Sequence, residues 1–331
     1  MFMAAALDEA RKGIGQSSPN PAVGAVIVSK GKIIAAGFHR AAGQPHAEIE
    51  ALRALPQSAD AAGSSIYITM EPCSTTGRTP PCTSAIIEHR FARVIYGATD
   101  PNPAHAGRAQ SILTVAGIAV TSGVLASECS AINEAWNHWI CTRLPFVIAK
   151  CGMSLDGRIS SHPSGRWITS IAARRDTMAR RATVDAVLVG GQTARDDNPR
   201  LTVRGIRGAR QPWRVVWSPS GDLPPTLHLF TDRHRDKTLV CRHPRLHDVL
   251  EELGRRDITS VLIEGGGRTL GEAFDSGLVQ RVEFYVAPVL IGGPVPAVGG
   301  VGVAANDEAI ALKEVRYETV GTDLKISALV G

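Results

Sequence analysis

Two runs of the chain decide how the rest is interpreted: Pro45-His46-Ala47-Glu48 and Glu71-Pro72-Cys73-Ser74-Thr75-Thr76-Gly77-Arg78-Thr79-Pro80-Pro81-Cys82. An imidazole and two thiols, from His46, Cys73 and Cys82, can fill three corners of a zinc tetrahedron and leave the fourth for water. The Glu48 carboxylate, two residues after the imidazole, can lie beside that water without being a ligand. The two runs therefore predict a zinc site with one open position.

An open zinc position beside a carboxylate is typical of zinc-dependent deaminases, in which an activated water attacks a ring carbon and the glutamate moves protons. We expect Cys82 to begin a helix, where partial positive charge favours the thiolate that zinc requires. The alternatives are a structural zinc site or thiols without metal. A structural site normally closes with four protein ligands, and no fourth ligand is evident at suitable spacing. The pattern therefore favours one catalytic zinc ion in the first half of the chain.

The composition indicates a soluble globular protein of two domains. The chain has 331 residues, of which 44% are hydrophobic and 20% charged, and a net charge of +5. The basic excess lies in the second half, mostly as arginine between Arg158 and Arg214. A phosphorylated ligand suits this excess, a solvated surface explains it equally well, and composition alone leaves nucleic acid open.

Targeting signals are not evident. The chain begins without the basic run of a signal peptide, and no apolar run approaches the ~20 residues that span a bilayer. The six cysteines have no regular spacing, which predicts reduced thiols and a cytoplasmic location.

The pattern of the first half predicts alternating strands and helices, which is an α/β layered sandwich. Strands are expected at 23–28, 33–37, 65–70, 93–97 and 118–121, and helices at 3–12, 46–55, 81–90, 106–116 and 127–142. Pro19-Asn20-Pro21 excludes regular helix around Asn20. His46 and Glu48 then lie in the first turn of one helix, and Cys73 follows a buried strand.

A second domain is expected to begin at Pro145, because Arg143-Leu144-Pro145 breaks the preceding helix. This places the domains at 1–144 and 145–331. Strands are predicted at 146–150, 186–189, 214–217, 238–240, 260–263 and 282–286, and helices at 171–181, 246–254 and 269–275. Gly265-Gly266-Gly267-Arg268-Thr269 separates a strand from a helix, where backbone N–H groups can hold a pyrophosphate. Glycines at a tight turn are, however, more often structural.

Further runs of the first half carry a family resemblance: Pro19-Asn20-Pro21-Ala22-Val23-Gly24, Gly37-Phe38-His39, Ala42-Gly43-Gln44-Pro45 and Asp100-Pro101-Asn102-Pro103. With the eight residues between Cys73 and Cys82, they resemble the bifunctional riboflavin-biosynthesis deaminase–reductase. The resemblance implies a cytidine-deaminase-like three-layer α/β/α domain. It also implies that His46, Cys73 and Cys82 bind zinc and that Glu48 is the proton shuttle. Asn20 and His39 would lie near the pyrimidine, unless Asn20 is only a turn residue and His39 a surface histidine.

The loop after Cys73 departs from the family pattern. The family usually carries histidine after Cys-Ser, often as Cys-Ser-His-His-Gly, whereas this chain has Ser74-Thr75-Thr76-Gly77. Because the zinc ligands are unaffected, we expect deamination to be retained. A histidine that could hydrogen-bond the substrate is nevertheless missing.

The second half resembles the reductase half of the same family. The matching runs are Lys150-Cys151-Gly152-Met153-Ser154-Leu155-Asp156-Gly157-Arg158, Trp167-Ile168-Thr169-Ser170, Asp197-Asn198-Pro199-Arg200-Leu201-Thr202-Val203-Arg204 and Ile263-Glu264-Gly265-Gly266-Gly267. The resemblance implies a dihydrofolate-reductase-like α/β domain that uses NADPH. Two segments depart from it: His162-Pro163-Ser164-Gly165-Arg166 replaces Ser-Gly-Glu-Ser, and Trp217-Ser218 replaces Leu-Asp or Ile-Asp.

Two sets of residues follow from this second resemblance. Cofactor contacts are expected from Gly152, Trp167, Thr169, Thr193, Asp197, Ser218, Gly266, Gly267, Arg268, Thr269 and Leu270. Contacts to the ribose phosphate or base are expected from Arg181, Leu201, Arg204 and Glu264. Independently of the resemblance, an arginine fork matches phosphate oxygens, with surface ion pairing as the alternative. Trp167 could equally be a core aromatic.

The resemblance as a whole implies two consecutive riboflavin steps on phosphorylated pyrimidines. It also implies a homo-oligomer, either a dimer through the reductase domain or a larger assembly, with no nucleic-acid or membrane partner. One rival is a nucleoside or tRNA base deaminase fused to an unrelated nucleotide-binding domain. The other is a non-enzymatic protein whose zinc site only holds the fold and whose second half binds nucleotides or nucleic acid. The sequence leaves open the hydride face and whether the intermediate passes between sites.

Overall fold

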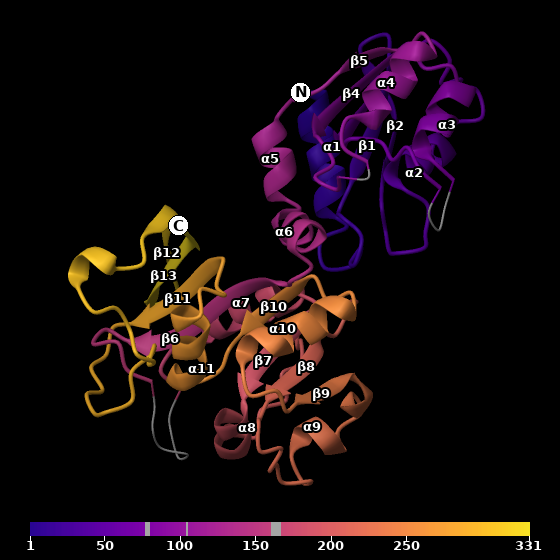
Figure 1. Ribbon diagram of the computed structural model, residues 1–331. Coiled ribbons are helices and arrows are strands. Elements are labelled where there is room, and N and C mark those ends of the chain that lie inside the picture. Colours follow the sequence, from indigo (N-terminus) through magenta and orange to yellow (C-terminus); the bar gives the residue numbers. More distant parts are fainter. Residues whose placement is uncertain (77–79, 104, 160–166) are drawn as a thin grey trace. The chain divides into compact units, whose positions relative to one another are not determined.

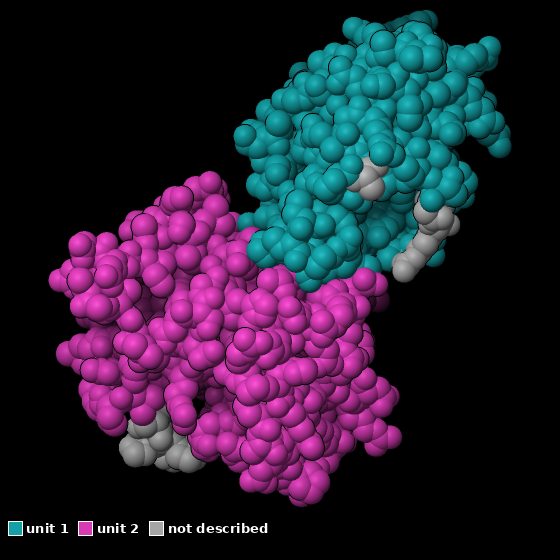
Figure 2. Space-filling model, in the orientation of Figure 1, with its two compact units in different colours: residues 1–143 teal, residues 144–331 magenta. Residues whose placement is uncertain are grey.

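The computed structural model describes residues 1–76, 80–103, 105–159 and 167–331. It divides into two units, Met1–Arg143 and Leu144–Gly331 (Figure 1, Figure 2). Two predicted segments lie outside the described residues: Gly77, Arg78 and Thr79 of the loop quoted above, and the 162–166 segment that departs from the pattern of the resembled family. Both units combine helices with a sheet, so the predicted α/β class is confirmed for each.

The first unit has a five-stranded sheet in the order β2-β1-β3-β4-β5. Its strands are β1 (Gly24–Ser29), β2 (Lys32–Phe38), β3 (Ser65–Met70), β4 (Arg93–Ala98) and β5 (Ala119–Thr121). Strands β3, β4 and β5 run parallel, whereas β1 is antiparallel to β2 and β3. The carboxyl ends of β3 and β4 therefore lie side by side, and the segments that follow them meet at one edge of the sheet.

Helices cover both faces of this sheet. They are α1 (Phe2–Arg11), α2 (Ala47–Arg53), α3 (Cys82–Glu88), α4 (Arg108–Val115), α5 (Ala126–Ala131) and α6 (Glu134–Thr142). Strand residues alternate between two cores: Ile27 packs with α2, α3 and α4, while its neighbour Val26 packs with α1 and α5. Alternate residues of a strand point to opposite faces, so the unit is the three-layer sandwich that was predicted.

One predicted helix of the first unit is wrong in extent. A single helix over 127–142 is expected from the sequence, but the structure has α5 and α6 with a break at Ile132 and Asn133. The buried Asn133 amide is engaged elsewhere, because its Oδ1 accepts from the Ala22 N–H at 2.7 Å and its Nδ2 donates to the Ala22 carbonyl at 3.0 Å. Asn133, at this break, thus anchors the loop that carries Asn20.

The second unit has an eight-stranded sheet in the order β12-β13-β11-β6-β10-β7-β8-β9. Its strands are β6 (Phe146–Ser154), β7 (Ala186–Gly190), β8 (Trp213–Trp217), β9 (Thr238–Cys241), β10 (Ser260–Ile263), β11 (Arg281–Ala287), β12 (Leu312–Val320) and β13 (Asp323–Val330). Its α-helices are α7 (Ile171–Arg181), α8 (Gly191–Asp197), α9 (His228–Thr231), α10 (Leu246–Arg255) and α11 (Gly267–Asp275). From β11 through β9 neighbouring strands run parallel. Leu250 of α10 and Leu270 of α11 pack into the core on one face.

The sequence reading missed the last two strands. β12 pairs antiparallel with β13, and its register shifts between Lys313 and Arg316, where Glu314 has a φ of 52°. Such a bulge interrupts the alternation by which a strand is recognised. Along β12 nearly every residue is exposed, so burial provides no pattern either. Over the described residues, no helix is long and apolar enough to cross a membrane.

Candidate active sites

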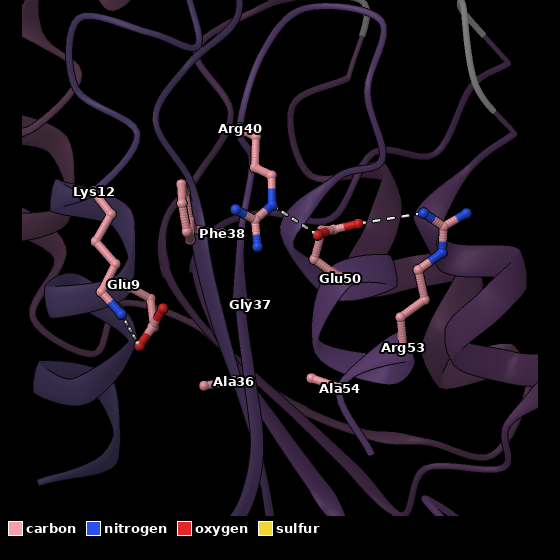
Figure 3. A pocket seen from close by; sticks show the side chains of 9 residues that line it. All are labelled: Glu9, Lys12, Ala36, Gly37, Phe38, Arg40, Glu50, Arg53 and Ala54. Atoms are coloured by element: carbon pink, nitrogen blue, oxygen red, sulfur yellow. Dashed lines mark hydrogen bonds and ion pairs between the residues drawn. The ribbon is translucent and has the colours of Figure 1, made fainter. Parts of the chain in front are cut away.

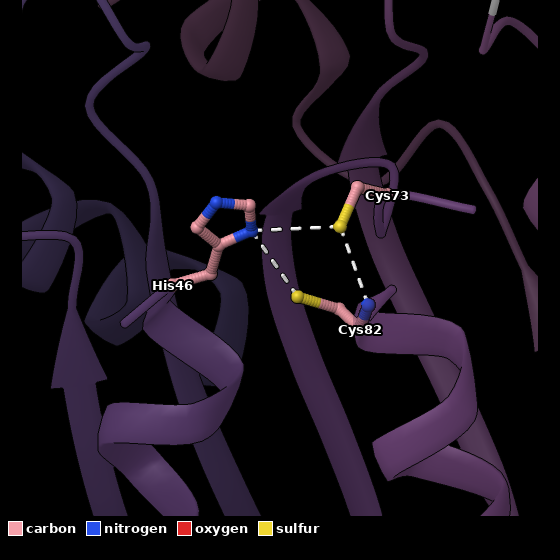
Figure 4. A group of neighbouring side chains, drawn as sticks. All are labelled: His46, Cys73 and Cys82. Carbon is pink, nitrogen blue, oxygen red and sulfur yellow. Dashed lines mark hydrogen bonds between the residues drawn. The ribbon is translucent and has the colours of Figure 1, made fainter. Parts of the chain in front are cut away.

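The three predicted zinc ligands lie together at the edge formed by the carboxyl ends of the β3 and β4 strands. Figure 4 shows His46 Nδ1 facing both thiols, at 3.5 Å from Cys73 Sγ and 3.3 Å from Cys82 Sγ. His46 is the N-cap of α2 rather than part of its first turn, and Cys82 is the first residue of α3. Two helix starts and the end of one strand therefore position the three donor atoms.

The donor set fits a zinc ion. Zinc bonds of about 2.1 Å to nitrogen and 2.3 Å to sulfur, at tetrahedral angles, separate nitrogen from sulfur by about 3.6 Å. Hydrogen bonding from Cys82, and then from His46, lowers the pKa of Cys73 to about 4 against the effect of burial. The Cys82 backbone N–H at the start of α3 also donates to Cys73 Sγ at 3.2 Å. Cys73 is thus held as the thiolate that a metal needs.

Glu48 lies in the first turn of α2 and is only 3% exposed. Burial is the main cause that raises the pKa of its carboxyl, and the neighbouring Cys73 thiolate raises it further. Its side chain also interacts with Cys82. A raised carboxyl pKa beside the donor set suits a group that must both take and give a proton near neutral pH.

His39 is buried rather than a surface histidine, with 2% of its surface exposed. Its Nδ1 lies 3.0 Å from the Pro45 carbonyl, which can only accept, so Nδ1 carries the proton. Nε2 then accepts from the Asn20 amide at 3.0 Å. Burial lowers the pKa of His39 and favours this neutral form. Since the His39 ring meets the His46 ring edge-on at 5.3 Å, the Asn20–His39 pair lies beside the zinc ligands.

Glu71 joins the loop that bears Cys73 to the segment after β4, a role that the sequence did not predict. Its buried carboxylate accepts three backbone N–H groups, from Asp100 at 3.3 Å, Gly107 at 3.0 Å and Ala109 at 3.1 Å. These contacts fix the segment after β4 against the loop that bears Cys73. The sequence offered one indication of this role, a glutamate directly after a buried strand. The residues that donate to this glutamate are remote in sequence.

In the second unit, the predicted residues converge on another edge made by parallel strands. Gly152 is near the end of β6, Glu264 follows β10, Thr193 lies on α8 directly after β7, and Ser218 follows β8. Because these four strands are mutually parallel neighbours, their carboxyl ends share one edge. Ligands of α/β sheets bind at such an edge.

The cofactor candidates at this edge make close contacts. Thr193 Oγ1 accepts from the Gly266 N–H at 3.1 Å, and a Cβ on Gly152 would lie 3.0 Å from Thr169 Cγ2. A Cβ on Gly191 would lie 2.7 Å from Ser218 Oγ. Among the described residues, no side chain caps α11, which begins at Gly267 and continues through Arg268, Thr269 and Leu270. An uncapped helix start bordered by glycines fits the pyrophosphate of a dinucleotide.

Two further cofactor candidates are Trp167 and Asp197. Trp167 is 72% exposed, so it is not a core aromatic, and the Arg174 guanidinium lies 4.8 Å above its ring. Asp197 ends α8, a helix that sequence reasoning missed because its N-cap and its first residue are both glycine. Burial raises the pKa of the Asp197 carboxyl, with a further contribution from Asp196.

The four substrate candidates of the second unit are connected through hydrogen bonds and the chain itself. Arg181 and Glu264 make a bidentate ion pair, with Nε–Oε1 at 2.6 Å and Nη2–Oε2 at 2.8 Å. Arg181 also donates to the Thr202 carbonyl at 3.0 Å, and Arg204 donates to the Thr202 hydroxyl at 3.2 Å. Leu201 is buried beside them with a φ of 51°. Since the fork of Arg181 is taken by Glu264, Arg204 is the arginine better placed to meet a phosphate.

Lys150 is a further candidate that the sequence reasoning did not assign. It lies on β6, and a Cβ on Gly152 would be 3.9 Å from its Nζ. Burial alone would raise the pKa of Glu264, but Arg181 and then Lys150 outweigh it and lower the pKa. The Lys150 ammonium, 5.6 Å above the Tyr285 ring, is thus a cation beside both residue sets. Lys150 could have been predicted from the sequence, because it begins the Lys150–Arg158 run that resembles the family.

A surface hollow of about 360 Å³ lies elsewhere in the first unit (Figure 3). It is lined by Glu9, Lys12, Ala36, Gly37, Phe38, Arg40, Glu50, Arg53 and Ala54. Its charges are paired among themselves, with Lys12 bound to Glu9 and both arginines bound to Glu50. None of the predicted site residues lines it.

Comparison with known proteins matches both halves. Residues 1–98 match the family described as cytidine and deoxycytidylate deaminase zinc-binding region, and residues 145–326 match the RibD C-terminal domain. The riboflavin biosynthesis protein RibD of Mycobacterium tuberculosis is 42% identical over 98% of this chain and 95% of that protein. The structure of Acinetobacter baumannii RibD is 32% identical, with a TM-score of 0.91 over 100% of this chain and 98% of that one. A Thermotoga maritima structure described as a diaminohydroxyphosphoribosylaminopyrimidine deaminase/5-amino-6-(5-phosphoribosylamino)uracil reductase is 31% identical, with a TM-score of 0.92 over 100% and 98%.

Proposed function

Because the chain belongs to the RibD family of riboflavin-biosynthesis proteins, we propose that it catalyses two consecutive steps of riboflavin biosynthesis. The first is hydrolytic deamination of 2,5-diamino-6-ribosylamino-4(3H)-pyrimidinone 5′-phosphate. The second is NADPH-dependent reduction of the ribosyl group of 5-amino-6-(5-phosphoribosylamino)uracil to ribityl. The observation that carries the proposal is a three-donor zinc site with Glu48 beside it, in a chain that matches both halves of the family.

For the deamination we assign zinc binding to His46, Cys73 and Cys82. When bound, zinc makes a water molecule acidic enough to act as a nucleophile at neutral pH. Glu48 accepts a proton from the attacking water and delivers it to the amino group, which leaves as ammonia. Asn20 and His39 hold the pyrimidine ring, and the neutral His39 orients the Asn20 amide.

For the reduction we assign cofactor binding to the edge described above. NADPH supplies the hydride, and the uncapped start of α11 together with Thr193 holds its pyrophosphate. Arg204 binds the substrate phosphate, while the Arg181–Glu264 pair fixes the chain around Leu201 and Thr202. Lys150 stabilises negative charge that develops on the opened sugar.

We propose that the deaminase domain is 1–144 and the reductase domain 145–331. The structural division after Arg143 and the family match that begins at residue 145 support this boundary.

We also propose that the protein is a homodimer through the reductase domain. β12 is the outer strand of the eight-stranded sheet, and Tyr317 on it is 68% exposed. An exposed edge strand with large apolar side chains favours association with a second copy. Sedimentation velocity that shows only monomer at assay concentrations would contradict the dimer.

A cytoplasmic location is proposed because all six cysteines are free of disulfides and two of them must remain reduced to bind metal. Activity found outside the cytosolic fraction would contradict it.

The rival in which the second half is unrelated does not explain the match of residues 145–326 to the RibD C-terminal domain. A coupled assay tests the proposal directly. Zinc-loaded wild type with the pyrimidine substrate should release ammonia and oxidise NADPH. Glu48→Gln should lower ammonia release by at least about 100-fold, yet retain zinc and reduce the supplied intermediate.

Two matched controls sharpen this assay. Glu50→Gln, on the same helix but facing the hollow of Figure 3, should release ammonia normally. Arg204→Ala should weaken reduction, whereas Arg207→Ala, on the exposed chain nearby, should not. Absence of both ammonia release and NADPH oxidation in wild type would overturn the proposed function.

A further inference from the structure

The loop that lacks the usual histidine has a histidine from another segment beside it. Thr75 Oγ1 and His105 Nδ1 are hydrogen-bonded at 3.2 Å, although the residues are 30 positions apart. Thr75 lies two residues after the zinc ligand Cys73, and both Thr75 and His105 are partly exposed. An imidazole is therefore present at the rim of the zinc site, supplied from the segment after β4.

The position of His105 is fixed by the surrounding backbone. Glu71 accepts N–H groups on both sides of it, from Asp100 and from Gly107. The His105 N–H donates to the Asn102 carbonyl at 2.9 Å, and the His105 carbonyl accepts from the Arg108 N–H at 3.1 Å. The Thr75 hydroxyl then orients the ring through Nδ1. Because Nδ1 makes this hydrogen bond, Nε2 is the ring atom left to bind a ligand.

A second polar group in the same loop also has unused hydrogen-bonding capacity. The Ser74 hydroxyl is buried and, among the described residues, has no hydrogen-bond partner. Buried polar atoms in native proteins are nearly always satisfied, by protein, water or ligand. The 74–75 segment and His105 thus present donors and acceptors that the described protein does not use.

The order of the sheet suggests which part of a substrate would reach them. Asn20 precedes β1 and His39 follows β2, whereas Cys73 follows β3 and His105 comes after β4. With the order β2-β1-β3-β4, the Asn20–His39 pair and His105 lie on opposite sides of Cys73. A ring held by Asn20 and His39 leaves the β4 side for the rest of the substrate.

We propose that His105 binds the phosphate of the deaminase substrate and that Thr75 positions its imidazole for this contact. The inference rests on the deamination proposed above. It assigns to His105 the substrate contact that the family's loop histidine could make, supplied here from a different segment of the chain.

Steady-state deamination by the full zinc-loaded chain tests this, with the phosphorylated pyrimidine and its dephosphorylated counterpart as substrates. His105→Ala should raise KM for the phosphorylated substrate about tenfold, the effect of losing one hydrogen bond to a charged group. Its kcat should stay within about threefold, and KM for the dephosphorylated compound should not change. His89→Ala, at an exposed histidine after α3, is the control and should leave every constant unchanged.

A rescue variant separates substrate binding from a structural effect. Thr75→His in the His105→Ala chain restores an imidazole to the loop and should return KM to near the wild-type value. Zinc content should be equal in all variants, and so should NADPH oxidation measured with supplied intermediate. An unchanged KM in His105→Ala, an equal rise for both substrates, or no rescue would overturn the assignment. A wild type that releases no ammonia would instead overturn the proposed function itself.

Discussion

Replacement of Glu264 by glutamine should destabilise the second unit more than any other single change at its candidate site. Both side chains of the Arg181–Glu264 pair are 9% exposed, and the pair is bidentate at 2.6 and 2.8 Å. Glu264→Gln leaves the Arg181 guanidinium buried without a counter-charge. Removal of one partner of a buried pair costs about 3–5 kcal/mol. Since glutamine keeps one oxygen acceptor and Arg181 keeps the Thr202 carbonyl, we expect the lower end, about 3 kcal/mol.

Calorimetry measures this loss. For a domain of this size, about 3 kcal/mol lowers Tm by roughly 6–12 °C. Asp248→Asn removes one member of the exposed Arg245–Asp248 pair, and it should leave Tm unchanged because exposed pairs contribute little. The double variant Arg181→Met with Glu264→Leu should regain most of the stability, since apolar side chains replace buried pairs well. A Glu264→Gln chain with wild-type Tm would refute the reasoning.

The same variant predicts a dependence on pH. Arg181 and Lys150 lower the pKa of Glu264 below its ordinary value of 4.5 despite burial. A depressed carboxyl pKa stabilises the folded state above the unfolded value and loses this contribution as pH falls through the folded value. The Tm difference between wild type and Glu264→Gln should therefore be full at pH 7 and shrink below about pH 4.5. A difference that grows on acidification would contradict the assigned charge state.

Three further results are expected. Removal of zinc with a chelator should abolish ammonia release but leave NADPH oxidation with supplied intermediate, and zinc should restore the first activity; a parallel loss of both would contradict separate sites. Thr193→Val removes the hydroxyl that accepts from the Gly266 N–H, so KM for NADPH should rise about tenfold with deamination unchanged, and an unaltered KM would argue against a cofactor contact. Asn133→Ala leaves the Ala22 N–H and carbonyl without their partner. The free energy of unfolding should fall by about 2 kcal/mol, and deamination should slow. Deamination at the wild-type rate would show that the Asn20 loop needs no such anchor.

The three candidate zinc ligands could be predicted to lie together because each is at the start or end of an element that local patterns define. His46 precedes α2, Cys73 follows β3 and Cys82 begins α3. The patterns that mark these ends each extend over only a few residues: a β-branched run, a proline pair and a change of hydrophobic period. The Glu71 contacts were not predictable in this way, because its partners lie 29, 36 and 38 residues further along the chain. Only the pairing of β3 with β4 brings them together.

In the second unit, too, local patterns decided which elements could be predicted from the sequence. Glycine at 190 and 191 concealed α8, since glycine is a poor helix former, and a bulge concealed β12. The motif residues Gly152, Thr193, Ser218 and Glu264 nevertheless meet at one edge, because each follows or ends one of a set of parallel strands. A residue directly after a strand can therefore be assigned to a site from sequence once the strands are known to be parallel.

Parallel topology also determines which loops lie next to each other at the zinc site. In both units the strand ends fix where the backbone of each loop begins, while the loops decide which side chains are presented. At the zinc site, two loops leave neighbouring parallel strands, and Glu71 joins them through three backbone N–H groups. Side chains from the two loops therefore lie next to each other, as Thr75 and His105 do. Loss of histidine at Thr75 does not by itself remove an imidazole from the site, because the adjoining loop supplies His105 at hydrogen-bonding distance.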